Sequence, residues 1–382
     1  MTVLFWACVG YVLYVYAGFP VLVLLRGRIA QRPYARGGMT PAVSVVIAAR
    51  NEEASIGRRI ENLLSLDYPA DRLDVVIASD GSDDGTDEIV RGFQSDRVTL
   101  VAPGRVGKPE ALNAAVEAAT GEVLVFSDAN SVFRTDAVRR LVAPLADPTV
   151  GGVAGNQVYL PPDSGDASVV GEQQYWDLDR ALKRAESDAG SVSGATGAIY
   201  AIRRSLFTPL RRDVSNDDLL ESLGVVAQGA RLVFEPEAVA YEYVAETTRL
   251  TFERRVRVMV GGFRCLWVMR GVMNPFRHGF FAIQLLTRKV LLRTMVIPLA
   301  LLSVLAPILW THGLVYRLAV VGEIEFYALA VCGALLRDAP TGKKRIFALP
   351  AYFCLVNIAS AKALLQMARG ERYERWEPAR PS

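Results

Sequence analysis

The sequence predicts an α/β domain with a largely parallel sheet, flanked by apolar segments that are long enough to cross a membrane. Three observations predict it. Short β-branched runs alternate with amphipathic stretches in the middle of the chain, and polar residues follow most of those runs. The chain is also 51% hydrophobic with a mean hydropathy of +0.23, high for a purely soluble protein, and the apolar excess lies at the two ends.

The first expected element is a membrane anchor. Residues 3–25 carry no charge and are long enough to span a bilayer. No basic segment precedes them and no clear small-residue cleavage site follows, so they are interpreted as an uncleaved anchor and not as a signal peptide. Arg26, Arg28, Arg32 and Arg36 come next, and the positive-inside rule places the following domain in the cytoplasm.

Four short runs are predicted to be strands of one sheet, at residues 43–49, 73–79, 98–102 and 123–127. Polar clusters follow three of them: Arg50-Asn51-Glu52, Asp80-Gly81-Ser82 and Asp128-Ala129-Asn130. Open α/β sheets bind ligands outside the carboxyl ends of their strands. We therefore expect the three clusters to converge on one crevice.

The C-terminal third is expected to lie at or in the membrane. Between residues 249 and 290, apolar side chains recur at helical spacing with arginines among them, which predicts helices at the membrane surface. Candidate spans follow at 291–310, 313–336 and 345–366, and the middle one contains two glutamates that are costly in hydrocarbon unless they face protein or water. Three spans after one anchor place the C-terminus outside, whereas the arginines of the tail favour the cytoplasm, so both topologies remain open.

The predicted organisation is an anchor (1–26), an α/β domain (42–245), interface helices (246–290), about three transmembrane segments (291–367) and a tail (368–382). A net charge of +3 is too small to indicate nucleic-acid binding, and arginines beside apolar segments favour anionic lipid head groups. Four widely spaced cysteines in or beside apolar stretches indicate neither a zinc site nor a disulfide framework.

Seven short motifs occur in a fixed order: NEEASIG (51–57), SDGSDDGT (79–86), GKPEALN (107–113), FSDANS (126–131), GATGAIYAIRR (194–204), NDDLL (216–220) and FEPEAVAYE (234–242). In this order and spacing they resemble the membrane-bound family-2 glycosyltransferases, the group that contains cellulose, chitin and hyaluronan synthases. The resemblance covers about residues 42–270 and the anchors. It implies a GT-A fold, a nucleotide-sugar donor that is usually UDP-linked, and a divalent cation, Mg²⁺ or Mn²⁺.

The resemblance also implies roles for particular residues on the donor side. Glu52 and Asp80 match contacts to the uridine half of the donor, and Lys108 matches a donor-binding lysine. Asp128 matches the first residue of the D-x-D metal motif, and one carboxylate can suffice because Mg²⁺ is often bound by one or two carboxylates plus substrate phosphates. Asn130 stands where many members have a second Asp; its carbonyl can bind metal or sugar but adds no charge. From the residues alone, the same stretch also fits a helix-capping turn.

The stretch NDDLL supplies a candidate general base. Asp218 matches the base aspartate of the family and Asp217 the acid before it. The residues alone predict a helix start with two acids in its first turn. Both interpretations agree, because the helix N-terminus keeps a carboxylate ionised.

Residues 254–258 fall where processive members carry Q-x-x-R-W. Arg257 matches the arginine, Arg254 replaces the glutamine and Val258 replaces the tryptophan. These arginines would pair with the donor diphosphate, or they form a basic strip that faces lipid phosphates. The GATGA stretch is interpreted as part of the acceptor side, or as ordinary close packing, and Trp176 is interpreted as a core residue.

We therefore expect a multi-pass protein of the inner or plasma membrane that acts as an inverting glycosyltransferase. It would move a sugar from a UDP-sugar to an acceptor hydroxyl in polysaccharide or glycoconjugate synthesis. Three alternatives remain: a lipid glycosyltransferase acting on a polyprenyl phosphate or a glycolipid, a processive polysaccharide synthase, and a noncatalytic nucleotide-binding membrane scaffold. The expected partners are a UDP-sugar, a saccharide or lipid-linked acceptor and membrane lipids, without nucleic acid. Valine at position 258 favours the addition of one or a few sugars.

Overall fold

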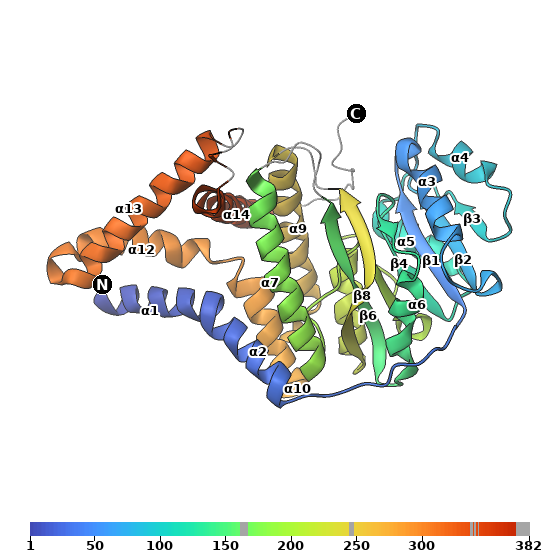
Figure 1. The fold of residues 1–382 in the computed structure, drawn as a ribbon, viewed down its shortest axis with the longest axis horizontal. Coiled ribbons are helices and arrows are strands. Elements are labelled where there is room, and N and C mark those ends of the chain that lie inside the picture. Colours follow the sequence, from blue (N-terminus) through green and yellow to red (C-terminus); the bar gives the residue numbers. More distant parts are fainter. Residues whose placement is uncertain (161–166, 244–247, 337–338, 340, 343, 372–382) are drawn as a thin grey trace.

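The computed structural model describes residues 1–160, 167–243, 248–336, 339, 341–342 and 344–371. A sheet domain occupies one end of the molecule and a group of long helices the other (Figure 1). Most of the predicted tail, residues 372–382, lies outside the described residues.

One sheet of eight strands forms the centre of the domain, in the spatial order β3-β2-β1-β4-β7-β6-β8-β5. The strands are β1 (Val43–Ala49), β2 (Leu73–Ser79), β3 (Val98–Val101), β4 (Val123–Phe126), β5 (Val132–Phe133), β6 (Val150–Leu160), β7 (Tyr200–Arg203) and β8 (Arg231–Tyr243). The four predicted strands are present and pair in parallel. The other half is mixed, because β7 runs antiparallel to both β4 and β6.

Helices cover both faces of the sheet. On one face lie α3 (Glu53–Leu64), α4 (Thr86–Gly92) and α6 (Ala137–Val142), and on the other α5 (Lys108–Ala118) and α8 (Asp217–Ala227). Because side chains alternate along a strand, Val45 and Ile47 of β1 pack under α3 while Val46 and Ala48 pack under α5. The helices on the two faces hold the sheet in place and so fix the strand ends from which the polar loops emerge.

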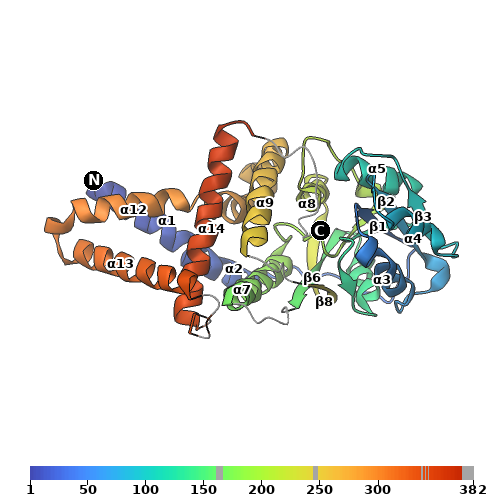
Figure 2. The ribbon, with the colours of Figure 1, turned by 90° about the horizontal axis from the view of Figure 1, so that it is seen from above.

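A second layer of helices joins the sheet domain to the apolar end (Figure 2). It contains α7 (Ala167–Ala189), α9 (Thr248–Val268), α10 (Pro275–His278) and α11 (Phe280–Leu285). The predicted surface helix is α9, and its apolar residues Val256, Met259 and Val260 pack against Ala359 and Ala363 of α14 (Arg345–Ala368). That face is therefore buried in the protein and not presented to lipid.

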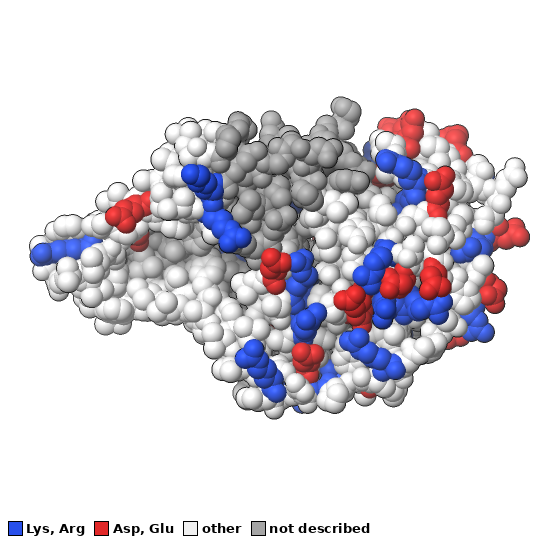
Figure 3. All heavy atoms as spheres, in the orientation of Figure 1, with Lys and Arg blue, Asp and Glu red and all other residues white. Residues whose placement is uncertain are grey.

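Within the part of the chain that the structure describes, three helices are long and apolar enough to cross a membrane. The first runs without a break from Thr2 to Ile29 and contains α1 (Thr2–Leu13) and α2 (Phe19–Ile29); the others are α13 (Leu314–Leu335) and α14. Uncharged surface covers most of the wing that α1, α12 (Val296–Ile308) and α13 form, whereas charged side chains gather over the sheet domain (Figure 3).

The predicted span 291–310 falls on two helices that meet at a bend. Residues Phe280–Leu291 and Val296–Ile308 form a pair of helices bent by 61°, which could together make a fourth, broken span. Pro298 explains where the second arm begins, because proline lacks an N–H and is accommodated in the first turn of a helix.

Candidate active site

The loops after β1 and β2 are tied to each other by hydrogen bonds. The Asp80 amide donates to the Ala49 carbonyl (2.9 Å), and the Glu52 amide donates to Thr86 Oγ1 (2.8 Å). Asn51 has a φ of 51°, a left-handed conformation that Asn tolerates, and its Oδ1 accepts from the Asp83 amide (3.1 Å). The first two polar clusters thus form one wall, with Glu52 and Asp80 both buried.

Asp80 shapes the loop that precedes α5. Its Oδ1 accepts hydrogen bonds from the amides of Val106 (2.8 Å) and Gly107 (2.7 Å), and its Oδ2 lies 3.2 Å from the Arg105 guanidinium. Gly107 has a φ of 93°, which favours glycine, and α5 begins at the next residue. The buried Asp80 carboxylate therefore determines where Lys108 stands.

Lys108 connects the third cluster to the start of α8. Its Nζ lies 3.2 Å from Asp128 Oδ1 and 3.1 Å from Asp217 Oδ2. Burial lowers the pKa of Lys108, but the nearby carboxylates of Asp217 and Asp128 outweigh burial and raise it above its usual value. The lysine therefore stays charged, and it holds Asp128, at the end of a strand, close to Asp217, at the start of α8.

Asp218 follows Asp217 in the first turn of α8 and lines a cavity. Its Oδ1 accepts a hydrogen bond from the Leu219 amide (2.7 Å). Burial and the charge of Asp217 raise the pKa of Asp218 to about 6, against the opposing effect of Lys108. A carboxylate with a pKa near the working pH suits general-base chemistry.

Asp128 stands among oxygen-bearing groups from distant strands. The buried carboxylate of Glu242 on β8 interacts with the side chains of Asn130 and Gln157, and it lies 3.9 Å from the Arg254 guanidinium. Burial raises the pKa of Glu242; Arg254 opposes this and Asp128 adds to it. In the described residues no cluster of three or more His, Cys, Asp or Glu could hold a metal. The oxygens of Asp128 and Asn130 instead suit a cation whose remaining ligands come from a diphosphate.

A glycine-containing loop, residues 194–198, closes over the acids. A Cβ on Gly197 would lie 3.0 Å from Asp128 Oδ2, so a larger residue would push against the carboxylate. The Ala195 amide donates to Ser222 Oγ on α8 (2.9 Å). The loop is thus closely packed against both Asp128 and α8, and it also lines the cavity.

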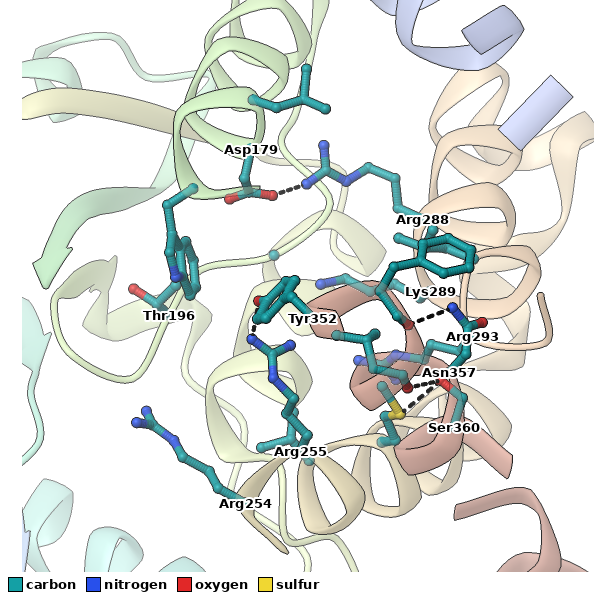
Figure 4. A pocket seen from close by; sticks show the side chains of 18 of the residues that line it. Asp179, Thr196, Arg254, Arg255, Arg288, Lys289, Arg293, Tyr352, Asn357 and Ser360 are labelled. Carbon is teal, nitrogen blue, oxygen red and sulfur yellow. Dashed lines mark hydrogen bonds and ion pairs between the residues drawn. The ribbon is translucent and has the colours of Figure 1, made fainter. Parts of the chain in front are cut away.

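The cavity has a volume of about 1080 Å³ and extends from Asp128 and Asp218 to the apolar helices. Seven Lys or Arg side chains and three Asp side chains are among its lining residues. In Figure 4, Arg288 is directed at Asp179 and Arg255 at Tyr352. Among the described residues, the donor-side trio Glu52, Asp80 and Lys108 does not line it. The cavity borders these three residues at Asp128, which lines it and contacts Lys108.

Only some of the residues 254–258, which match the Q-x-x-R-W position, line this cavity. Arg254 and Val258 line it, together with Arg255, which the resemblance did not single out. Arg257 lies on the same helix, but it is not among the described lining residues. The interpretation of Trp176 as a core residue is wrong: its ring lies in the cavity wall, 5.2 Å from the ring of Tyr159.

Sequence reasoning missed two buried groups beside the acids. Arg59 on α3 donates to Ser127 Oγ (2.7 Å) and lies over the Phe133 ring, and burial lowers its pKa to about 9, against the opposing charge of Asp128. Glu221 on α8 accepts from the buried Tyr200 hydroxyl, and burial raises the pKa of both groups well above their usual values. Neither has a local sequence signal, because their partners lie on other elements.

A mixed α/β sheet with acids at its strand ends and helices on both faces defines a domain of the GT-A class. The comparisons agree on this class. Residues 44–210 match the family Glycosyl transferase family 2, so the chain carries a domain of that family.

Known relatives match a part of the chain. It is 26% identical over 253 residues to the poly-beta-1,6-N-acetyl-D-glucosamine synthase of Staphylococcus aureus (strain COL), covering 64% of this chain and 60% of that protein. The synthase of the same name from Staphylococcus epidermidis is 27% identical over 233 residues, 59% of this chain and 55% of that protein. The chain thus spans less than two thirds of the length of these curated relatives.

A solved structure matches almost the whole chain. The mannosyltransferase PcManGT from Pyrobaculum calidifontis, in complex with GDP-Man and Mn²⁺, has a TM-score of 0.67 at 24% identity, covering 94% of this chain and 99% of that one. The fold of the sheet domain and its apolar helices is therefore shared with that protein.

Proposed function

We propose that the protein is a membrane-bound inverting glycosyltransferase that moves a sugar from a nucleotide sugar to an acceptor hydroxyl. The observation that carries this is the Lys108 bridge, which draws Asp128 and Asp217 together beside Asp218 at the edge of a cavity. Direct displacement needs a base, a group that holds the leaving diphosphate, and an enclosed geometry. The residues around this bridge can supply all three.

The donor binds on the sheet side of the acids in this proposal. Glu52 and Asp80 form the nucleoside wall, and Lys108 lies where it can neutralise a diphosphate. We expect UDP as the nucleoside diphosphate. The GDP-Man bound by the solved relative supports testing guanosine donors alongside. We also assign Asn130, Arg254 and Arg257 to the donor. The Glu242 carboxylate links two of them, because it interacts with the Asn130 side chain and lies 3.9 Å from the Arg254 guanidinium.

Asp128 and Asn130 would hold a divalent cation, Mg²⁺ or Mn²⁺, and the Mn²⁺ in the solved relative supports this assignment. When bound, such a cation supplies positive charge that stabilises the leaving diphosphate. The chain's own contribution is the rest of the step. Asp218 takes the proton of the acceptor hydroxyl. The ion pairs of Lys108 hold Asp128 and Asp217 in place beside it, and the 194–198 loop excludes water from the acids.

The sheet domain faces the cytoplasm in this proposal. Arg26 and Arg28 end the N-terminal helix, and their side of the membrane is the one that the positive-inside rule assigns to the cytoplasm. A nucleotide-sugar donor is a cytoplasmic metabolite class, so the two assignments are consistent. The apolar helices would carry the domain in the inner or plasma membrane.

The test is a donor screen with the purified full chain in detergent. UDP-sugars and GDP-sugars are offered separately with Mn²⁺ and a lipid extract, and nucleoside diphosphate release and product are measured. We expect one nucleoside class to support release that the Asp218→Asn variant does not. If no donor binds or turns over, a noncatalytic scaffold explains the chain better than a transferase.

A further inference from the structure

Lys289 lies in a cavity where lysine and arginine side chains outnumber the carboxylates among the lining residues. It lies in Phe280–Leu291, the first arm of the bent helix pair, and it is within electrostatic range of Arg288, Arg293 and Lys183 and of the Asp179 carboxylate. Asp179 and Glu186 neutralise Arg288, and Asp179 also lies 3.0 Å from Lys183. By contrast, Lys289 makes no hydrogen bond or ion pair with any residue that the structure describes.

Positive charge gathered away from bulk water is unfavourable unless an anion joins it. The Lys289 ammonium lies against the 194–198 loop, 3.6 Å from where a Cβ on Gly194 would stand, and it is within electrostatic range of Asp218. Gly262 leaves room for the Arg293 guanidinium, since a Cβ there would overlap with it. The chain is therefore built to bring these cations next to the candidate base.

The wall beyond these cations is apolar and belongs to the candidate membrane spans. It is formed by Val12 and Tyr16 of the N-terminal helix, Phe326 and Leu329 of α13, and Leu349, Phe353 and Val356 of α14. A nucleotide has no group that matches such a wall, and Glu52, Asp80 and Lys108 are not among the described lining residues. An amphiphile with a phosphate matches both parts of the cavity, because the two cations Lys289 and Arg293 can bind its oxygens and the spans can line its chain.

We propose that the acceptor is a saccharide linked through phosphate to a lipid, and that its phosphate binds at Lys289 and Arg293 while its chain lies along α13 and α14. This rests on the proposed function. The sugar then lies between the phosphate and Asp218, beside the rings of Trp176 and Tyr159. In transfer, the acceptor hydroxyl oxygen bonds to the anomeric carbon, its proton goes to Asp218, and the bond to the donor phosphate breaks. The nucleoside diphosphate leaves with that electron pair.

The experiment measures binding to the full chain in nanodiscs. The probes are undecaprenyl phosphate, undecaprenol and inorganic phosphate, and the nucleotide sugar found in the donor screen is titrated in parallel. Lys289→Met and Arg293→Met are compared with Lys289→Arg and with Arg277→Met, which removes an exposed arginine near the same region. Thermal unfolding of each variant checks that it is folded.

We expect undecaprenyl phosphate to bind more tightly than undecaprenol, and inorganic phosphate not to displace it. Each methionine variant should weaken phosphate-lipid binding about tenfold or more, as the loss of one hydrogen bond to a charged group implies. Lys289→Arg and Arg277→Met should bind as the wild type does, and donor affinity should stay unchanged throughout.

Three outcomes overturn the inference: equal binding of the phosphate and the alcohol, competition by inorganic phosphate alone, or a loss of donor affinity in Lys289→Met. The last would assign the cations to the donor diphosphate. A wild-type chain that binds no nucleotide sugar refutes the proposed function instead, so the two failures are distinguishable.

Discussion

Asp218 is the residue on which the proposed chemistry depends most. Replacing it with Asn keeps its volume, so donor binding and folding should persist while transfer falls by about two to four orders of magnitude. Turnover and nucleotide-sugar affinity are measured together, with Asp71→Asn, an exposed carboxylate outside the site, as the matched control. Near wild-type turnover in Asp218→Asn would assign the base elsewhere.

The pH profile tests the same residue independently. Because the pKa of Asp218 is raised to about 6, the carboxylate is protonated below that pH and ionised above it. Turnover should therefore fall as the pH drops through about 6 and level off towards neutrality. The residual activity of Asp218→Asn should lack this acid limb; an unchanged limb would mean that another group titrates.

The metal assignment is tested at Asp128 and Asn130. Asp128→Ala should abolish tight Mn²⁺ binding measured with nucleoside diphosphate present, because it removes the only carboxylate of the motif. Asn130→Asp should retain activity and bind Mn²⁺ more tightly, since it adds a carboxylate. Calorimetric titration of both variants decides this, and an Mn²⁺ affinity in Asp128→Ala equal to that of the wild type removes Asp128 from the metal site.

At the scale of elements, two glycines of the N-terminal helix make opposite predictions. A Cβ on Gly27 would lie 2.8 Å from Cα of Ala185 on α7, whereas nothing lies within 4 Å of a Cβ on Gly10. Gly27→Ala should destabilise the protein by about 1–3 kcal/mol through overpacking. Gly10→Ala should be neutral or stabilise it by up to about 1 kcal/mol. Thermal unfolding in one detergent compares them, and equal midpoints would show that the helix does not pack on α7.

The elements differ in how far the sequence could predict them. The strand at 43–49 and its parallel neighbours carry dense β-branched runs and strand-end polar clusters, so their pairing followed from local pattern. The antiparallel β7 has four residues within a glycine-rich stretch and gives no such pattern. Two contacts of the site could not be predicted in this way, because each joins distant elements. Lys108 and Asp217 come from two different helices, and Glu242 on β8 interacts with Asn130 in the loop after β4.

At the scale of the whole molecule, the length of the product is the open prediction. Val258 lines the cavity and gives no flat ring for a growing chain, while the apolar helices described provide three candidate spans and one bent pair. We expect one or a few sugars to be added to an acceptor. Sizing labelled product from one nucleotide sugar checks this. A long polymer made without added acceptor, as the names of the staphylococcal relatives suggest for those proteins, would contradict it.

The Lys108 bridge has a consequence for the order in which ligands arrive. Lys108 is the counter-ion of Asp128, so if Asp128 holds a cation as proposed, a free metal ion would have to displace an ammonium that two carboxylates hold. A cation already joined to a diphosphate would meet less competition, because the phosphate oxygens would accept hydrogen bonds from Lys108 while Asp128 would hold the cation. In this exchange of partners, each carboxylate and each phosphate would keep a positive group beside it. The metal and the nucleotide should therefore enter as one complex, and neither should bind well alone.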